Sequence, residues 1–464
     1  MEPPTRLSRR RLLQLGAGLG LPAVLAACAQ VVPSLSASPR TSVIGTPAGS
    51  AVRTPAPTPT PVPTARPSRP IAAGRVLYRG AALADGRSAT LQRPVSVLVE
   101  DGRIAWIRPT GGENDPGDAR IVDASGATMV PGMIDGHSHV TGQGGAHWIE
   151  RFADDPATLL EVAEANGRAA WDAGVRWLRD VGSPIGLDPQ DGRQRALALG
   201  VRDRWAGRRD VPYLRAAGAW VMRRGSSAVS GAVEADNADE LLGAALGQLD
   251  AGADLVKLYL DGPEPGVAPW SPTEVRRVVD AAHGREARVT AHAGHLDAAR
   301  TAVAGGVDAI EHGFVLDAGV AAQMAAAGTM LVTTLTVFHS WISFAATTDL
   351  RLFVNGRAGH AERLERAEAS VRLARDAGVA IAAGTDFGGG SPRAGQLAWE
   401  VEALVSAGLE PVEALSAATW RGGELLGEPD AGVIREGGPA DFFFVHGDPL
   451  SDPAALWRIW RAEG

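Results

Sequence analysis

The chain has 464 residues, of which 45% are hydrophobic and 21% charged, so it can bury a large core and form more than one structural unit. Its formal net charge of −8 provides no basic footprint, which argues against nucleic acid as a partner. The single cysteine excludes an intramolecular disulfide and a zinc site built from cysteines.

The N-terminal segment has the parts of an export signal. Basic residues precede a short apolar segment at 15–27, and small residues then lead to Cys28. Residues 8–13 resemble a twin-arginine export motif and residues 25–28 a bacterial lipobox. We therefore predict a signal peptide over residues 1–28 and a lipid on Cys28. The alternative is an uncleaved N-terminal anchor. Either way we expect a membrane-tethered protein on the outer, periplasmic or extracytoplasmic face.

The segment that follows, residues 29–70, is rich in Pro, Thr, Ser and Ala. Such a composition does not bury a core and favours extended, polyproline-like conformers. We predict a disordered stalk between the anchor and the folded protein. Recognition by adaptor domains is the alternative for a Pro-rich segment.

Short strands are expected on both sides of the central region. β-Branched and aromatic residues predict N-terminal strands at 75–78, 95–99 and 103–107, and C-terminal strands at 432–434 and 440–445. We expect the two groups to pair in one small β-sandwich, built from residues 71–130 and 426–464. The chain ends soon after residue 460, which leaves little room for a last strand.

Between these parts, residues 131–425 alternate apolar strand patterns with helical ones. Strands are predicted at 127–134, 174–180, 211–221, 253–260, 287–292, 307–312, 329–337 and 379–386. Helices are predicted at 159–171, 238–249, 273–283 and 360–377. This alternation predicts an α/β fold, a (β/α)8 TIM barrel inserted into the β-sandwich.

Polar residues occur where the predicted strands end, the edge at which such barrels carry their active sites. They are His137, His139, Lys257, His292, His312 and Asp386. His137 and His139 stand at i and i+2 of a strand, so they share a face and form half of a divalent-metal site. Singly, each has another reading: an incidental surface pair, a turn residue for His312, a helix N-cap for Asp386, a snorkelling side chain for Lys257. Their convergence on one barrel mouth favours a common function.

The sequence resembles the amidohydrolase superfamily from about residue 75 to the C-terminus. The resemblance rests on Pro-Gly-Met-Ile-Asp-Gly-His-Ser-His at 131–139, Val-Lys at 256–257, Thr-Ala-His-Ala at 290–293, Ile-Glu-His-Gly at 310–313, Gly-Thr-Asp at 384–386, and later matches at 408–419 and 438–441. Within the superfamily it is similar to the imidazolonepropionase-like branch with Xaa-Pro and Xaa-Arg dipeptidases and ochratoxin-type amidases.

The resemblance implies a hydrolase that cleaves a C–N amide bond, peptide-like or cyclic, in a small molecule. It implies two divalent cations, Zn²⁺ by preference, with His137, His139 and Asp386 on the more buried one. Lys257, carbamylated by CO₂, would bridge to a second cation held by His292 and His312. Asp386 would take a proton from water and deliver it to the leaving amine.

Two loops, at 221–227 and 260–266, depart from the Gly- and His-rich loops of related dipeptidases, so the sequence predicts no particular substrate. His295 either faces substrate or caps a helix. The other histidines are interpreted as structural or surface residues: His147, His283, His339, His360 and His446.

Two other functions remain open at this stage. A mononuclear deaminase or imidazolone-ring hydrolase on the same barrel would usually lack the strand-four lysine, so Lys257 discriminates against it. A solute-binding lipoprotein would share the anchor but has no use for six metal-ligand positions. A homo-oligomer is left open.

Overall fold

The computed structural model describes residues 74–113, 117–348 and 357–463. The chain divides into two units, residues 1–49 and 50–464, and every described residue belongs to the second. The expected signal peptide, Cys28 and the Pro-rich stalk lie outside the described residues and stay predictions. In the part of the chain that the structure describes, no helix combines the length and apolar character needed to cross a membrane.

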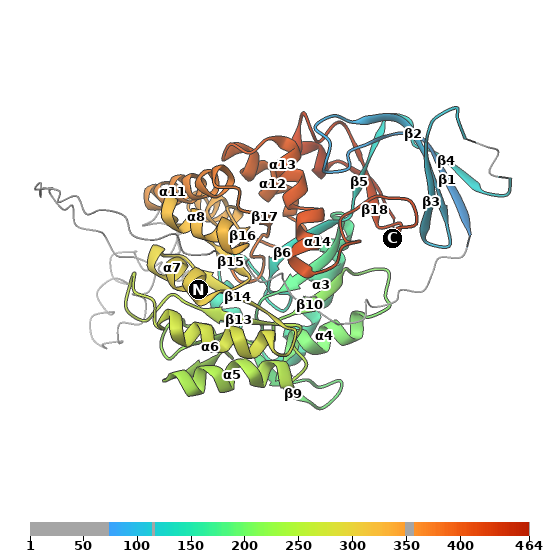
Figure 1. The fold of residues 1–464 in the computed structure, drawn as a ribbon. Helices are drawn as coiled ribbons and strands as arrows, with labels where there is room; N and C mark the ends of the chain where they lie inside the picture. Colours follow the sequence, from blue (N-terminus) through green and yellow to red (C-terminus); the bar gives the residue numbers. More distant parts are fainter. Residues whose placement is uncertain (1–73, 114–116, 349–356, 464) are drawn as a thin grey trace, which may run out of the picture. The chain divides into compact units, whose positions relative to one another are not determined.

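A seven-stranded sheet combines the beginning and the end of the described chain. Its order is β19-β18-β5-β1-β2-β3, with β4 pairing against β1. Figure 1 shows β18, from the red C-terminal part, beside β5. The strands are β1 (Arg75–Leu83), β2 (Gln92–Glu100), β3 (Arg103–Pro109), β4 (Arg120–Asp123), β5 (Ala127–Pro131), β18 (Phe442–His446) and β19 (Ile459–Glu463).

Strand β18 is buried on both faces because it separates two cores. Phe442 and Phe444 point into the core of the seven-stranded sheet, where Phe442 meets Tyr78 edge-to-face at 5.4 Å between ring centroids. Phe443 and Val445 point the other way, into the large core beneath the parallel strands. Because side chains alternate along a strand, the three consecutive phenylalanines pack into two different cores.

The stretch 127–134, expected as one strand, is divided at Gly132. The part before it, β5, pairs antiparallel with β18, and the part after it, β6 (Met133–Ser138), pairs parallel with β7 (Val175–Asp180). A Cβ at Gly132 would lie 2.3 Å from Cγ of Arg176, so only glycine fits where the chain passes from one sheet to the other. The backbone N–H of Gly132 donates to the carbonyl of Asp441 at 2.9 Å.

The C-terminal part differs from expectation in two places. Residues 432–434 form a loop instead of a strand, although Ile434 reaches the core of the seven-stranded sheet. The last residues do form a strand: β19 pairs antiparallel with β18. The expectation that the chain leaves little room for a last strand was wrong.

Parallel strands alternating with helices form the rest of the described chain, and this confirms the α/β class. Two parallel sheets are present, β10-β7-β6 and β12-β11-β13-β14-β15-β16-β17. Besides β6 and β7 they contain β10 (Tyr213–Ala216), β11 (Val221–Arg223), β12 (Val233–Ala235), β13 (Leu255–Tyr259), β14 (Arg288–Ala293), β15 (Ala309–His312), β16 (Met330–Thr333) and β17 (Ile381–Ala383). A short hairpin is formed by β8 (Ile185–Leu187) and β9 (Gln194–Ala196).

Backbone hydrogen bonds connect the two parallel sheets at both edges. The N–H of Asp254, just before β13, donates to the carbonyl of Ala216 on β10 at 2.8 Å. At the other edge the N–H of Asp386, just after β17, donates to the carbonyl of His137 on β6, also at 2.8 Å. Residues at the carboxyl ends of the first and last strands are thereby neighbours.

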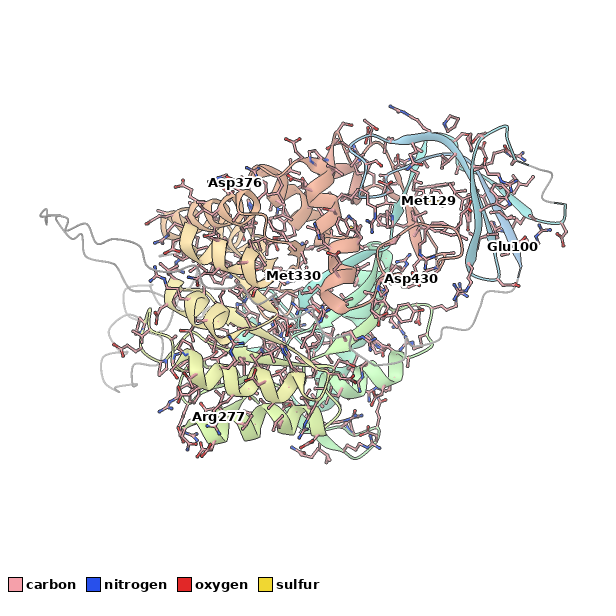
Figure 2. The ribbon with its side chains drawn as sticks, viewed as in Figure 1. Glu100, Met129, Arg277, Met330, Asp376 and Asp430 are labelled. Atoms are coloured by element: carbon pink, nitrogen blue, oxygen red, sulfur yellow. The ribbon has the colours of Figure 1, made fainter. Side chains whose placement is uncertain are left out.

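Helices pack outside these strands: α5 contacts β13, α6 contacts β14, and α7 contacts β14 and β15 (Figure 1). Figure 2 shows buried Met129 and Met330 within the two parts of the fold, and exposed Arg277 and Asp376 at its surface. The helices are α2 (Trp148–Arg151), α3 (Pro156–Asp172), α4 (Leu197–Trp205), α5 (Ala238–Asp250), α6 (Pro272–His283), α7 (Leu296–Gly305), α8 (Ala318–Ala327), α9 (Thr336–Phe344), α11 (Arg357–Asp376), α12 (Leu397–Ser406), α13 (Pro411–Ala417), α14 (Trp420–Leu426) and the 3₁₀ helix η1 (Pro453–Trp457).

The seventh predicted strand is shorter than expected because a helix begins inside it. β16 ends at Thr333, and α9 begins at Thr336. The buried carboxylate of Glu400, on α12, accepts the backbone N–H of Leu335 at 3.0 Å and that of Thr336 at 2.8 Å. Glu400 thus satisfies the free N–H groups at the start of α9 from across the fold.

Candidate metal centre

Five of the six predicted ligands lie within one residue of the carboxyl end of a parallel strand or just beyond it, and Lys257 lies two residues before the end of β13. His137 belongs to β6 with His139 just after it, and Lys257 lies in the middle of β13. His292 is near the end of β14, His312 ends β15, and Asp386 follows β17. All except His292 are less than 9% exposed. The parallel order of the strands therefore brings all six side chains to one edge of the fold.

Three of them form a close group. Oδ1 of Asp386 lies 3.3 Å from Nε2 of His137 and 3.3 Å from Nε2 of His139. One ligand atom from each residue lies within 4.8 Å of the others, as one divalent cation requires. Burial alone would raise the pKa of Asp386, but the surrounding imidazoles hold this pKa well below its usual value.

The outer nitrogens of both histidines are already engaged. Nδ1 of His137 lies 2.7 Å from a carboxylate oxygen of Glu311, and Nδ1 of His139 lies 2.7 Å from the carbonyl oxygen of Gly182. Carboxylate and carbonyl oxygens only accept, so each Nδ1 carries the hydrogen and each Nε2 keeps its lone pair. The lone pairs therefore face Asp386, the arrangement that metal-binding histidines adopt.

Sequence reasoning missed the carboxylate behind His137. Glu311 is fully buried on β15, where Nη2 of Arg179 on β7 donates to it at 2.5 Å and the hydroxyl of Thr290 also contacts it. Burial would raise the pKa of Glu311, but the charges of Arg179 and Lys257 hold this pKa well below its usual value. The available signal was an acid, Glu311, inside the otherwise apolar start of β15, and buried arginines in β7.

The surroundings of Lys257 are unfavourable for a charged amine. It is 2% exposed, and no described residue accepts a hydrogen bond from Nζ. Burial lowers its pKa to about 8, although the charges of Glu311 and Asp386 act in the opposite direction. The snorkelling alternative is wrong because the amine is inside the protein. A buried amine that donates no hydrogen bond to a described residue is costly for the protein.

His292 and His312 lie beside the close group but outside it. Their ring centroids are 4.5 Å apart, and the His312 ring is 4.6 Å from that of His137. Burial and the neighbouring rings hold the pKa of His312 well below 6.5, which keeps it neutral and able to bind a cation. Its Nδ1 is 2.8 Å from the hydroxyl of Thr334.

His295 lies at the rim of this edge. It occupies the N-cap position of α7, but its side chain makes no capping hydrogen bond, so the capping alternative is wrong. Its side chain is 46% exposed, with Nε2 4.0 Å from a carboxylate oxygen of Asp261. The N-cap alternative for Asp386 also fails, because α12, the next helix, has Gln396 at that position.

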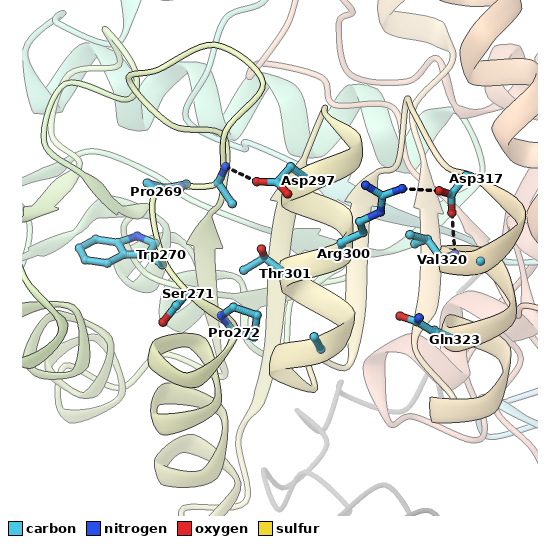
Figure 3. A pocket seen from close by; sticks show the side chains of 13 residues that line it. Pro269, Trp270, Ser271, Pro272, Asp297, Arg300, Thr301, Asp317, Val320 and Gln323 are labelled. Atoms are coloured by element: carbon cyan, nitrogen blue, oxygen red, sulfur yellow. Dashed lines mark hydrogen bonds and ion pairs between the residues drawn. The ribbon is translucent and has the colours of Figure 1, made fainter. Parts of the chain in front are cut away.

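A separate surface cavity of about 800 Å³ lies among α6, α7 and α8. Figure 3 shows its charged lining: Arg300 pairs with Asp317 at 2.6 Å, and Asp297 accepts the N–H of Ala268. None of the six predicted ligands lines this cavity. Among the described residues, the group that could hold a metal ion lies at the strand ends and not at this cavity.

The fold and the site together define a class, α/β proteins that gather histidines and an aspartate at the carboxyl ends of parallel strands to bind metal. The chain belongs to the amidohydrolase family, whose model matches residues 128–459.

Several proteins and solved structures are similar to this chain. The chain is 31% identical to an uncharacterised protein of Mycobacterium tuberculosis over 390 residues, which cover 82% of this chain and 92% of that protein. It is 28% identical to an imidazolonepropionase of Salinispora arenicola, covering 80% and 89% of the two chains. A crystal structure of a Xaa-Pro dipeptidase has the same fold, with a TM-score of 0.72 and 23% identity, covering 83% of this chain and 97% of that one.

Proposed function

We propose that the protein is a metal-dependent hydrolase that cleaves a C–N amide bond by adding water to the carbonyl carbon. The observation that carries the proposal is the convergence of two imidazole lone pairs and one ionised carboxylate, from His137, His139 and Asp386. Family membership supports the same reaction class.

We further propose that this centre is binuclear and lies at the mouth of a closed (β/α)8 barrel. His137, His139 and Asp386 would hold the first cation, with His292 and His312 holding the second. Lys257, as a carbamate, would bridge the two, and its amine without a hydrogen-bond acceptor supports this role. When bound, zinc or a similar cation supplies Lewis acidity, which lowers the pKa of water and polarises the scissile carbonyl.

Asp386 performs the proton transfer in this scheme. Its carboxylate takes a proton from the water whose oxygen bonds to the carbonyl carbon, and it delivers that proton to the amine nitrogen as the C–N bond breaks. The low pKa of Asp386 keeps it in the basic form at neutral pH. Asp386→Asn should lower kcat at least about a hundredfold. Retention of more than a tenth of the activity would contradict the role.

Similar proteins suggest the substrates to try. A Xaa-Pro dipeptidase shares the fold, and an ochratoxinase of Aspergillus niger is 29% identical over 49% of each chain. An imidazolonepropionase is similar over a longer range. We propose a small peptide-like or cyclic amide as substrate, tested on the zinc-loaded enzyme with dipeptides and N-acyl amino acids, and with lactones as cyclic esters that lack the C–N bond.

Metal content tests the proposal against its alternatives. The purified protein should hold about two equivalents of zinc, whereas a mononuclear deaminase would hold one and a solute-binding lipoprotein none. Lys257→Ala should lose one or both cations and most activity, and acetate should restore part of it by occupying the bridging position. Lys257→Arg should also be inactive, because guanidinium is not carbamylated in this way. Full metal content and near-normal rates in Lys257→Ala would overturn the binuclear centre.

We also propose that the enzyme is exported already folded through the twin-arginine route and anchored outside the cytoplasm by a lipid on Cys28. The support is the N-terminal sequence alone. Cell fractionation should find the Cys28→Ser protein released from the membrane, and an Arg9→Lys, Arg10→Lys protein retained in the cytoplasm. Membrane attachment on the outer face in both variants would contradict the proposal.

A further inference from the structure

A carboxylate that the proposed reaction does not use lies against His292. Asp261 follows β13, and its Oδ2 is 3.0 Å from Nε2 of His292. The backbone N–H of Gly294 donates to both oxygens of the same carboxylate, at 3.1 and 3.0 Å. Asp261 is therefore anchored on one side and directed at the imidazole on the other.

The His292 ring is also held by its face. The ring of Tyr259, on β13, stacks on it with centroids 4.0 Å apart and an angle of 13° between the planes. A Cβ at Gly294 would come within 2.6 Å of Oδ2 of Asp261, so glycine at this position leaves space for the carboxylate. Face and edge contacts together fix both the plane and the rotation of the imidazole.

The carboxylate determines which nitrogen of His292 carries the hydrogen. Carboxylate oxygens only accept, so Nε2 donates and the lone pair lies on Nδ1. His137 and His139 have the opposite arrangement, because their Nδ1 atoms face a carboxylate and a carbonyl oxygen, and the engaged nitrogen of His312 is also Nδ1. His292 is thus the member of the set that offers Nδ1.

We propose that Asp261 is a positioning residue that fixes His292 in the tautomer with hydrogen on Nε2 and thereby presents Nδ1 to the second cation. The inference rests on the binuclear centre proposed above. Partners of this kind orient metal-binding histidines, and their loss typically weakens metal affinity about ten- to a hundredfold. Nothing in the sequence around Asp261 indicated this role.

The tautomer is measured first, on the full chain with ¹⁵N-labelled histidine and the His292 signals assigned from a His292→Gln variant. In the metal-free wild type, the hydrogen of His292 should be on Nε2, and it should stay there when Zn²⁺ is added. Hydrogen on Nδ1, or loss of the Nε2 hydrogen on zinc binding, would overturn the proposal without any Asp261 variant. The latter result would make Nε2 the ligand atom.

The variant comparison uses a matched pair. In Asp308, as in Asp261, one oxygen accepts both a histidine Nε2 and a backbone N–H, here from His283 at 2.9 Å and Val289 at 2.7 Å. This second pair contains none of the predicted ligands. Asp261→Ala removes the acceptor, so hydrogen should also be found on Nδ1 of His292, and binding of the second Zn²⁺ should weaken about ten- to a hundredfold, with the first unchanged. Asp308→Ala should leave both zinc affinities within about twofold.

The outcomes separate this inference from the proposed function. Wild-type protein that binds fewer than two zinc ions contradicts the binuclear centre, while the tautomer in metal-free protein still tests Asp261. Wild-type protein with two zinc ions, together with Asp261→Ala of unchanged tautomer and unchanged affinities, contradicts the role of Asp261 alone.

Discussion

At the scale of single residues, the site consists of ligands together with the groups that hold them. Two predicted ligands, His312 and Asp386, have left-handed backbone conformations with φ of 70° and 55°. Such conformations cost non-glycine residues about 1–2 kcal/mol and are concentrated at functional sites. In Asp386 the cost is offset in part by its N–H donating to the carbonyl of His137.

Glu311 provides a prediction at this scale. Glu311→Gln leaves Arg179 buried without its carboxylate, and we expect the free energy of unfolding to fall by about 3–5 kcal/mol. Affinity for the first cation should fall about tenfold or more, because His137 loses the carboxylate that holds it. Urea unfolding and zinc titration measure the two effects.

The control is an exposed ion pair. Arg224 and Glu234 lie 2.8 Å apart with side chains 59% and 34% exposed. Glu234→Gln should cost less than about 1 kcal/mol. Equal losses in the two variants would show that the buried position of Glu311 is unimportant.

The residue types of the candidate site could be predicted from the sequence, but not their supports. Alternation along a strand places His137 and His139 on one face, and the positions of the other ligands near strand ends place them at the same edge. The bond from Arg179 to Glu311 joins strands far apart in the sequence, and no local pattern encodes it. Asp261 was missed for the same reason.

At the scale of elements, periodicity predicted most of the strands but only four of the described helices, α3, α5, α6 and α11. Several of the differences follow from contacts that periodicity does not contain. The stretch 127–134 is uniformly apolar, yet it is divided because its halves enter different sheets. Helix α9 begins where a strand was expected because Glu400, distant in sequence, caps it. Strand β19 was missed because only the pairing with β18 defines it.

Glu400 supplies the prediction for this scale. Glu400→Ala removes the acceptor of two backbone N–H groups and of the Thr336 hydroxyl, which is 2.9 Å away. Since unpaired buried donors cost about 1–3 kcal/mol each, we expect a loss of at least about 2 kcal/mol in urea unfolding. Glu402→Ala, on the same helix, removes only a bond to the exposed Trp457 and should cost less than about 1 kcal/mol. The idea fails if the two losses are equal.

At the scale of the whole described chain, β18 makes the seven-stranded sheet and the parallel strands interdependent. Phe442 and Phe444 belong to one core and Phe443 to the other, so neither core is complete without this strand. We therefore expect the positions of the predicted ligands on the parallel strands to depend on residues near the C-terminus that do not touch them.

Calorimetry tests this interdependence. The described region should unfold in one cooperative transition, and Phe443→Ala should lower its stability by about 3–5 kcal/mol without dividing it. Phe444→Ala, directed into the other core, should shift the same transition. Two transitions, each sensitive to only one of these substitutions, would contradict the prediction.

The hydrogen bond from Asp386 to His137 has a consequence for how the protein matures. The first ligands leave the ribosome early in synthesis, whereas the aspartate that completes their group is made near the end. A nascent or truncated polypeptide that stops before residue 386 has the histidine pair without its carboxylate. If one cation is held by all three side chains, as proposed, it is bound only after synthesis has passed residue 386 of the 464.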